Sequence, residues 1–175
     1  GPDAGSSDGG PSDAADPADA GCFGPGCDPV VGIALTVDSS CALTRSGAVF
    51  CWGLGDHGQL GDGARARQRT PVAGQDLPGP ATAVAAGGNH TCAVLTGDGR
   101  VCCWGSGEFQ QLGDGLTGGR AKPFCFLGGA VAIAAGERTT CATLGSGEVM
   151  CWGGNHHGQA GAGTVVDRGP GEAAV

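Results

Sequence analysis

Short apolar runs recur at regular intervals along the chain, with turn-forming residues between them. Three of them, VVGIALT (30–36), ATAVAAGG (81–88) and AVAIAAGE (130–137), stand at a similar distance before a cysteine. None continues into a long 3.6-residue periodicity, which favours strands over helices. Because most of their side chains are small, we predict buried strands where sheets crowd together near a central axis.

A β-hairpin is predicted after each of these runs. The turns fall at 45–47, 96–99 and 145–147, and each returning strand ends in Cys-Trp-Gly. A proline-containing strand follows the first two hairpins, at 69–72 and 122–124. One repeat therefore holds four short strands, which is the content of a propeller blade.

The predicted fold class is all-β, with about three propeller blades of four antiparallel strands. We place the blade units at 30–57, 58–109 and 110–157, with a partial strand at 158–175, in a domain covering 22–175. Propellers typically have four to eight blades. Three blades therefore imply part of a longer propeller, half of a six-bladed ring made by two chains, or unusually capped edges. We expect a monomer or a fragment, and a homodimer stays open.

The spacing of the cysteines predicts which strands they join. With turns of three residues, Cys41 faces Cys51 and Cys141 faces Cys151. The second turn is one residue longer, so Cys92 faces Cys103 rather than its neighbour. Residues directly opposite on a hairpin lie close enough to form a disulfide.

Four further cysteines complete the predicted framework. Cys102 points to the other face of its strand, and by elimination its partner is Cys125. Cys22 and Cys27 flank a Pro-Gly turn, which favours a local disulfide over half of a zinc site. All ten cysteines are then paired, and this indicates an oxidising, secreted or cell-surface location.

A glutamine-containing loop follows each Cys-Trp-Gly. It reads GQLGDG at 58–63, QQLGDG at 110–115 and GQAGAG at 158–163. A phosphate-binding loop would require a following helix and a basic residue in place, and neither is present. We interpret the glycines as turn architecture that permits positive φ.

Charge and composition are unevenly distributed. The chain has a formal charge of −8, but residues 1–29 hold six aspartates and no lysine or arginine. Residues 1–21 are rich in Gly, Pro, Ser and Asp, which predicts a disordered tether. It is either a spacer from a cell surface, with an anchor upstream, or a terminus of no consequence. The rest is close to neutral, so a nucleic-acid partner is not expected, and no apolar run is long enough to span a membrane.

The candidate binding residues lie in the loops after Cys-Trp-Gly. A metal site built from their histidines would be possible, but histidines in glycine-rich loops are more often solvated, and no carboxylate or histidine set recurs in all three copies. No nucleophile has a local base, so we expect no enzyme and no cofactor. The candidates for contact with a partner are Asp56, His57, Glu108, Phe109, Asn155, His156 and His157.

These motifs together resemble those of the regulator of chromosome condensation family. The residues that carry the resemblance are Gly-Asn-His-Thr-Cys-Ala (88–93), the three Cys-Trp-Gly motifs and Gly-Gln-Leu-Gly-Asp-Gly (58–63). The resemblance implies a β-propeller, usually of seven blades, and the paired cysteines resemble the secreted bacterial branch. The chain departs from the pattern at Ser39 and Thr139, which stand where His90 does in the second copy.

Function does not follow from this fold alone. The leading hypothesis is an extracellular or cell-surface interaction module that binds an unidentified protein through loops on one propeller face. The founding family member implies an alternative, guanine-nucleotide exchange on a small GTPase. A secreted bacterial relative implies another, inhibition of an enzyme such as a β-lactamase.

Overall fold

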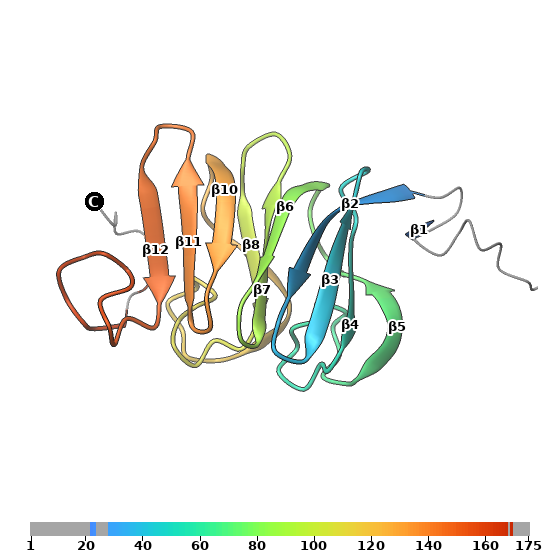
Figure 1. Cartoon of the computed structure of the whole chain (residues 1–175), viewed down its shortest axis with the longest axis horizontal. Helices are drawn as coiled ribbons and strands as arrows, with labels where there is room; N and C mark the ends of the chain where they lie inside the picture. The colour runs from blue at the N-terminus through green and yellow to red at the C-terminus, as the bar shows by residue number, and fades with distance from the viewer. Residues whose placement is uncertain (1–21, 24–27, 168, 170–175) are drawn as a thin grey trace, which may run out of the picture.

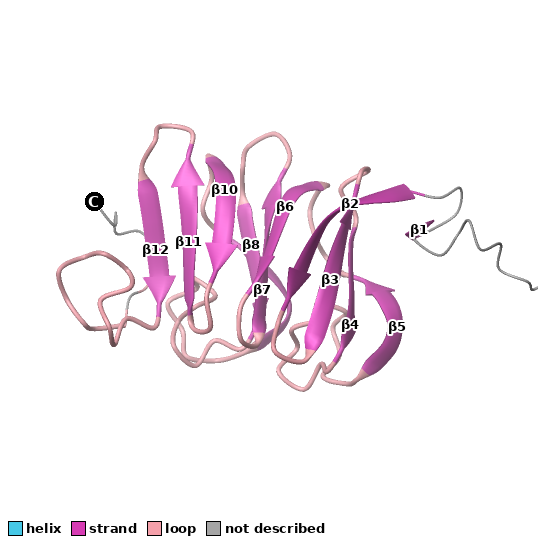
Figure 2. Cartoon of the chain, viewed as in Figure 1, coloured by secondary structure: helices cyan, strands magenta, loops and turns pink. Residues whose placement is uncertain are grey.

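The computed structural model describes residues 22–23, 28–167 and 169. They form three antiparallel sheets in a row (Figure 1), and no described residue is helical (Figure 2). We call the sheets blade 1, blade 2 and blade 3. The strands are β1 (Cys22–Phe23), β2 (Asp28–Leu35), β3 (Ser39–Thr44), β4 (Val49–Gly53) and β5 (Gln68–Ala73) in blade 1, β6 (Ala81–Ala86), β7 (His90–Leu95), β8 (Val101–Gly105) and β9 (Arg120–Cys125) in blade 2, and β10 (Ala130–Ala135), β11 (Thr139–Leu144) and β12 (Val149–Gly153) in blade 3.

The predicted hairpin register is confirmed. Cys41 pairs with Cys51 across β3 and β4, and Cys141 pairs with Cys151 across β11 and β12. Both pairs are disulfide-bonded. The second hairpin has the longer turn.

The longer turn moves the second cross-strand disulfide by one residue, as predicted. Cys92 faces and is bonded to Cys103. Cys102 points to the other face and is bonded to Cys125 on β9. Strand β8 is therefore bonded to both of its neighbours, to β7 on one face of the sheet and to β9 on the other.

The predicted blade boundaries are wrong. The bounds 58–109 and 110–157 assign each proline-containing strand to the following blade, but β5 pairs with β4 and β9 pairs with β8, so this strand is the fourth of its own repeat. The chain thus turns back onto the hairpin it has just left before it crosses to the next sheet. Among the described residues, blade 1 has these four strands and the short β1 beside them, blade 2 has four strands and blade 3 has three.

The three strands formed by the apolar runs, β2, β6 and β10, are less buried than predicted. Side chains on one face of β2 are exposed, among them Ile33 and Leu35, and Val131 on β10 is exposed as well. The alternation of exposed and covered residues along β2 is that of a sheet with one solvent-facing side. Only β6, in the middle of the row, is mostly covered as we expected.

Three further predictions concern the ends of the chain. The tether at 1–21 and the bond between Cys22 and Cys27 lie outside the described residues. In the described part of 158–175 no strand forms, so the predicted partial strand is not found there.

Adjacent blades are joined by a glutamine loop of one blade and the tryptophan of the next. Trp104 Nε1 donates a hydrogen bond of 2.9 Å to the Gln59 carbonyl oxygen, and Thr91 Oγ1 donates one of 3.0 Å to the same atom. Gly61 makes the approach possible, because a Cβ there would lie 2.7 Å from Trp104 Nε1. Both tryptophan and glutamine are fully buried.

The second interface repeats the first. Trp152 Nε1 and Thr140 Oγ1 donate hydrogen bonds of 2.9 and 3.0 Å to the Gln111 carbonyl oxygen. The loop keeps its shape although Gln110 replaces a glycine, because Gln110 itself adopts a φ of 63°. The structure of each interface is therefore set by the Gln-Leu-Gly core of the loop rather than by its first residue.

His90 is buried between blades 2 and 3. Its Nε2 lies 2.8 Å from Thr140 Oγ1, whose single proton is donated to the Gln111 carbonyl, so His90 is the donor. Its Nδ1 has no hydrogen-bond partner among the described residues. Burial lowers the pKa of His90 from 6.5 to about 4, because protonation would place a charge in the core.

Acidification is therefore expected to destabilise the fold through His90. The pKa is lower in the folded than in the unfolded chain, so the unfolded chain takes up the proton first. This contribution is present in full above pH 6.5 and is lost as the pH falls toward 4. The loss in the free energy of unfolding should reach about 3 kcal/mol, measured by urea denaturation across this range.

The control is His90→Phe, which keeps a ring but removes the proton. Asp28 and Asp98 do not interfere, because hydrogen bonds from Ser46 and Arg100 lower their pKa values below 3.8, outside this range. The variant is less stable at neutral pH because it loses a hydrogen bond, but its stability should change little between pH 6.5 and 4. An equally steep fall in the variant would rule out His90 as the cause.

A candidate protein-binding groove on the loop face

One side of the row of blades is built from loops. The segments that follow β4, β8 and β12 and the turns that precede β3, β7 and β11 lie together along the lower side in Figure 1. We call this side the loop face. The strands behind it are fixed by disulfides and by the buried tryptophans, so the loops stand on a rigid support.

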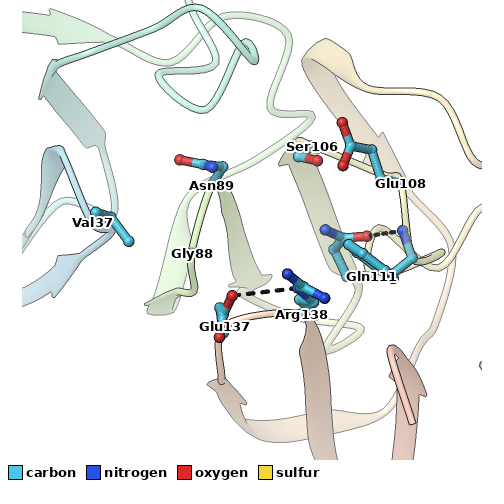
Figure 3. Close-up of a pocket in the computed structure, with 9 residues that line it drawn as sticks. Val37, Gly88, Asn89, Ser106, Glu108, Gln111, Glu137 and Arg138 are labelled. Atoms are coloured by element: carbon cyan, nitrogen blue, oxygen red, sulfur yellow. Dashed lines mark hydrogen bonds and ion pairs between the residues drawn. The ribbon is translucent and has the colours of Figure 1, made fainter. Parts of the chain in front are cut away.

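A cavity of about 140 Å³ opens on the loop face between blades 2 and 3. Figure 3 shows the polar residues that line it, which come from three segments of the chain and include Asn89, Glu108 and Arg138. A second cavity of about 420 Å³ adjoins it and is lined by His156 and His157. The two cavities share Glu137 and Arg138. Together they form one depression, which we call the groove.

An aromatic stack forms the wall between the two cavities. The Arg138 guanidinium carbon lies 4.3 Å from the centre of the Phe109 ring, and His156 meets the same ring edge-on with 6.0 Å between ring centres. Arg138 is also held by Glu137, with Nε and Oε1 3.3 Å apart. These contacts combine charged and apolar groups and hold the three side chains together before any partner arrives.

The polar groups around this stack are largely accessible. Glu108 and Glu137 are exposed carboxylates on the two sides of Arg138 (Figure 3). His156, which lines the second cavity, has its Nε2 3.6 Å from Asp167 Oδ1. The groove thus offers carboxylates, a guanidinium, imidazoles and a ring face within one depression, which suits protein recognition.

The structure brings together four of the predicted contact residues. Glu108, Phe109, His156 and His157 all line the groove, and they come from two different blades. Asp56 and His57 occupy the equivalent loop of blade 1 and line neither cavity, where His57 Nε2 lies 3.8 Å from Asp56 Oδ1.

One of the predicted contact residues is corrected. Asn155 is fully buried rather than exposed. Its side-chain amide donates to the Thr164 and Val166 carbonyls and its Oδ1 accepts from the Ala160 amide. Asn155 therefore shapes the loop at 155–166 and is not available to a partner.

Sequence analysis missed the central residue of the groove. Arg138 and Glu137 sit in the turn before β11, not in a loop after Cys-Trp-Gly. A signal was present, because the turn reads Gly-Glu-Arg in the third repeat and Gly-Gly-Asn in the second. A charged pair at a position that is neutral in the neighbouring repeat is a mark of a site.

Two features are absent from the described residues. Across residues 22–23, 28–167 and 169, no three histidine, cysteine, aspartate or glutamate side chains are grouped so that they could hold a metal ion. Within the same residues no helix is long and apolar enough to cross a membrane.

Fold and groove together define a β-propeller repeat protein whose blades are stapled by disulfides. The chain belongs to the regulator of chromosome condensation (RCC1) repeat family. One family profile matches residues 46–94 and 98–143, and a second matches 30–59, 81–111 and 130–159, one stretch for each blade.

Similar proteins are much longer than this chain. Human E3 ubiquitin-protein ligase HERC2 is 43% identical over 84 residues, which is 48% of this chain and 2% of HERC2. Zebrafish MYCBP2, another E3 ubiquitin-protein ligase, is 49% identical over 74 residues, or 42% of this chain and 2% of the ligase. The matched stretch is thus a small part of each relative.

Similar proteins of known structure are also longer than this chain. Human WBSCR16 superimposes with a TM-score of 0.74 at 30% identity, over 83% of this chain and 38% of its own. Yeast RCC1 (Prp20), solved bound to Kap60, gives a TM-score of 0.61 at 25% identity, over 75% of this chain and 31% of its own. The described blades therefore correspond to about a third of these two chains.

Proposed function

We propose that this protein is an extracellular or cell-surface interaction module that binds a protein partner through the groove. The observation that carries the proposal is the ordered stack of Arg138, Phe109 and His156 at the junction of two blades. Arginine and aromatic side chains are enriched where partners contribute most binding energy. A preformed stack also lowers the entropy lost on binding.

The chemistry of the groove favours a partner segment with a basic side chain. Arg138 is already engaged by Glu137 and by the Phe109 ring, so its charge is partly compensated. Glu108 is exposed beside the same cavity. A lysine or arginine of the partner could pair with this carboxylate while its aliphatic stem covers the ring face.

The compartment is supported by the cysteines. Four disulfides join all eight cysteines of residues 28–167. Structural disulfides form and persist in oxidising surroundings and are rare in the cytosol. This pattern is compatible with secretion, and it is the reason we prefer an extracellular partner.

Guanine-nucleotide exchange is the second candidate. It is favoured by the likeness to yeast Prp20p, which was solved in a study of its binding to Gsp1p and histones and superimposes with a TM-score of 0.58 at 27% identity. Exchange on a GTPase would require a reducing compartment, against which the disulfides count. Faster release of labelled nucleotide from a small GTPase on addition of this protein would establish it.

The interaction is tested by affinity capture from the extracellular fraction of the source cells, with the affinity for the captured partner measured by calorimetry. Arg138→Gln is expected to weaken binding about tenfold or more, because it removes the cation that orders the stack and adds no carboxylate that would attract a basic partner. Arg100→Gln is the matched control. The two side chains are similarly exposed, at 47% and 44%, and each pairs with an acidic neighbour.

Arg100 lies in the hairpin turn between β7 and β8, away from the loop face. Its variant should bind as the wild type does. Equal weakening by both variants would show that overall charge matters rather than the groove. If neither variant changes the affinity, the partner binds elsewhere and the proposed site is wrong.

A further inference from the structure

Two buried polar side chains line the smaller cavity of the groove, which has a volume of about 140 Å³. They are Ser106, which is 7% exposed, and Gln111, which is 2% exposed. Gln111 Oε1 accepts a bond of 2.8 Å from the Phe109 amide, but no described residue pairs with Gln111 Nε2 or Ser106 Oγ. Figure 3 shows the Gln111 nitrogen at the end of the side chain away from this bond. Because buried polar groups are rarely left unpaired, these two donors point to a ligand.

The walls of this cavity come from all three blades. Val37 belongs to blade 1, Ser106 to blade 2 and Glu137 to blade 3. Backbone hydrogen bonds fix their turns in a row, from the Val37 amide to the Gly88 carbonyl at 3.1 Å and from the Gly88 amide to the Glu137 carbonyl at 3.0 Å. The cavity is therefore framed by described residues of every blade.

The equivalent junction between blades 1 and 2 lacks one of the two donors. Leu54 stands there in place of Ser106, two residues after the tryptophan. The amides of Leu54 and Ser106 make the same bond, at 2.9 and 2.8 Å, to a carbonyl in the turn before the hairpin of their own blade. Gln59 Nε2 is also unpaired among the described residues, but it is enclosed, whereas Gln111 opens onto the cavity. The serine hydroxyl is thus a property of this cavity and not of the repeat.

The groups around the two donors favour an uncharged occupant. Glu108 and Glu137 are exposed carboxylates that line the same cavity, so a carboxylate or a phosphate would be repelled. An ammonium group has no lone pair and cannot accept a hydrogen bond from Ser106 or Gln111. The occupant must therefore accept bonds at the buried end of the cavity and donate bonds to the carboxylates.

We propose that this end of the groove binds a carboxamide, the side chain of an asparagine or glutamine of the protein partner. Its oxygen accepts hydrogen bonds from Ser106 Oγ and Gln111 Nε2, and its amino group donates to the Glu108 carboxylate. The inference rests on the proposed function, because the occupant belongs to the protein that binds the groove. A basic side chain nearby in the partner can share Glu108, since a carboxylate accepts several bonds.

The test begins with a random peptide library displayed on phage and selected on the immobilised full chain. We expect the selected peptides to share an asparagine or glutamine close in sequence to a lysine or arginine. One such peptide is then measured by calorimetry with the wild type and with the variants below. A selection that yields no shared carboxamide overturns the inference.

Ser106→Leu is the main variant, because it copies Leu54 of the first repeat and fills the cavity. It should weaken the peptide about tenfold or more, since the carboxamide loses its partners. Ser106→Ala removes only the hydroxyl and should weaken the peptide about threefold or more. Ser146→Leu is the matched control, at an exposed serine in the hairpin turn between β11 and β12, and should bind as the wild type does. Circular dichroism confirms that each variant is folded.

An exchange in the peptide completes a double-mutant cycle with Ser106→Leu. The carboxamide residue is replaced by an apolar residue of similar size, methionine for glutamine or leucine for asparagine. The wild type should lose affinity for this peptide about tenfold or more, and Ser106→Leu should lose nothing further. Equal losses with both proteins would place the carboxamide elsewhere and overturn the inference.

The Arg138→Gln variant separates this inference from the function on which it rests. If Arg138→Gln weakens the peptide and Ser106→Leu does not, the partner uses the stack alone, and only the carboxamide site is wrong. If neither variant changes the affinity, the peptide binds outside the groove, and both proposals are wrong.

Discussion

Reducing the four disulfides within residues 28–167 is expected to unfold this protein at room temperature. They close loops of 10, 11, 23 and 10 residues. By loop-closure entropy the bonds between hairpin strands stabilise the fold by about 2.7 kcal/mol each, and that between Cys102 and Cys125 by about 3.4 kcal/mol. Four such losses approach the whole stability of a typical domain, about 5 to 15 kcal/mol.

The measurement is urea denaturation followed by tryptophan fluorescence, with and without a phosphine reductant. Because most of the bonded cysteines are fully buried, the reduced sample must be prepared in denaturant and then refolded by dilution. The double variant Cys102→Ala/Cys125→Ala keeps three bonds and serves as the intermediate case. It should remain folded, with its stability lowered by about 3 kcal/mol. A reduced chain with the denaturation midpoint of the oxidised chain would show that packing alone sustains the blades.

Replacing Trp104 by alanine is the second change with a large expected effect. The side chain is fully buried between blades 1 and 2 and is the largest in that core. Truncating a buried tryptophan typically costs about 3 to 5 kcal/mol. We expect the upper end, because the Gln59 carbonyl also loses one of its two donors.

Trp52→Ala is the matched comparison, since Trp52 holds the equivalent position in blade 1 and is only partly buried. Its replacement should cost about half as much in the free energy of unfolding, measured by urea denaturation with circular dichroism. Equal losses would mean that the packing of Trp104 against blade 1 adds nothing to the free energy of unfolding.

The register of the hairpins could be predicted because it depends on local facts. A strand has a side-chain period of two, and a turn of known length fixes which residues face each other. One added residue between Leu95 and Val101 was enough to predict that Cys92 joins Cys103 and leaves Cys102 for the other face. The structure confirms both consequences.

The blade boundaries could not be predicted in the same way. Whether β5 pairs with β4 or with β6 depends on the path of the 14-residue connection after Gly53, and no local signal in the sequence sets that path. The exposure of Ile33 could not be predicted either, because it too depends on more than the local sequence. Its equivalents are covered by a preceding blade, so burial at this position depends on a neighbour and not on the strand itself.

The groove was predicted in part. The loops after Cys-Trp-Gly were recognisable as variable positions on a repeated scaffold, and Glu108, Phe109, His156 and His157 do line it. Arg138 was missed because its contact with Phe109 joins segments 29 residues apart in the chain. Asn155 was misjudged because a short polar residue in a loop can equally be the buried residue that organises it.

Mapping the disulfides of the purified protein tests the central claim most directly, that three blades are stapled in this register by an oxidised framework. Because Cys102 and Cys103 are adjacent, the linked peptides must be fragmented between them in the mass spectrometer. We expect Cys92 linked to Cys103, Cys102 to Cys125, Cys41 to Cys51 and Cys141 to Cys151, with no free thiol among these eight. A bond between Cys92 and Cys102, or reactive thiols at these positions in protein taken directly from its source, would contradict the register and the compartment inferred from it.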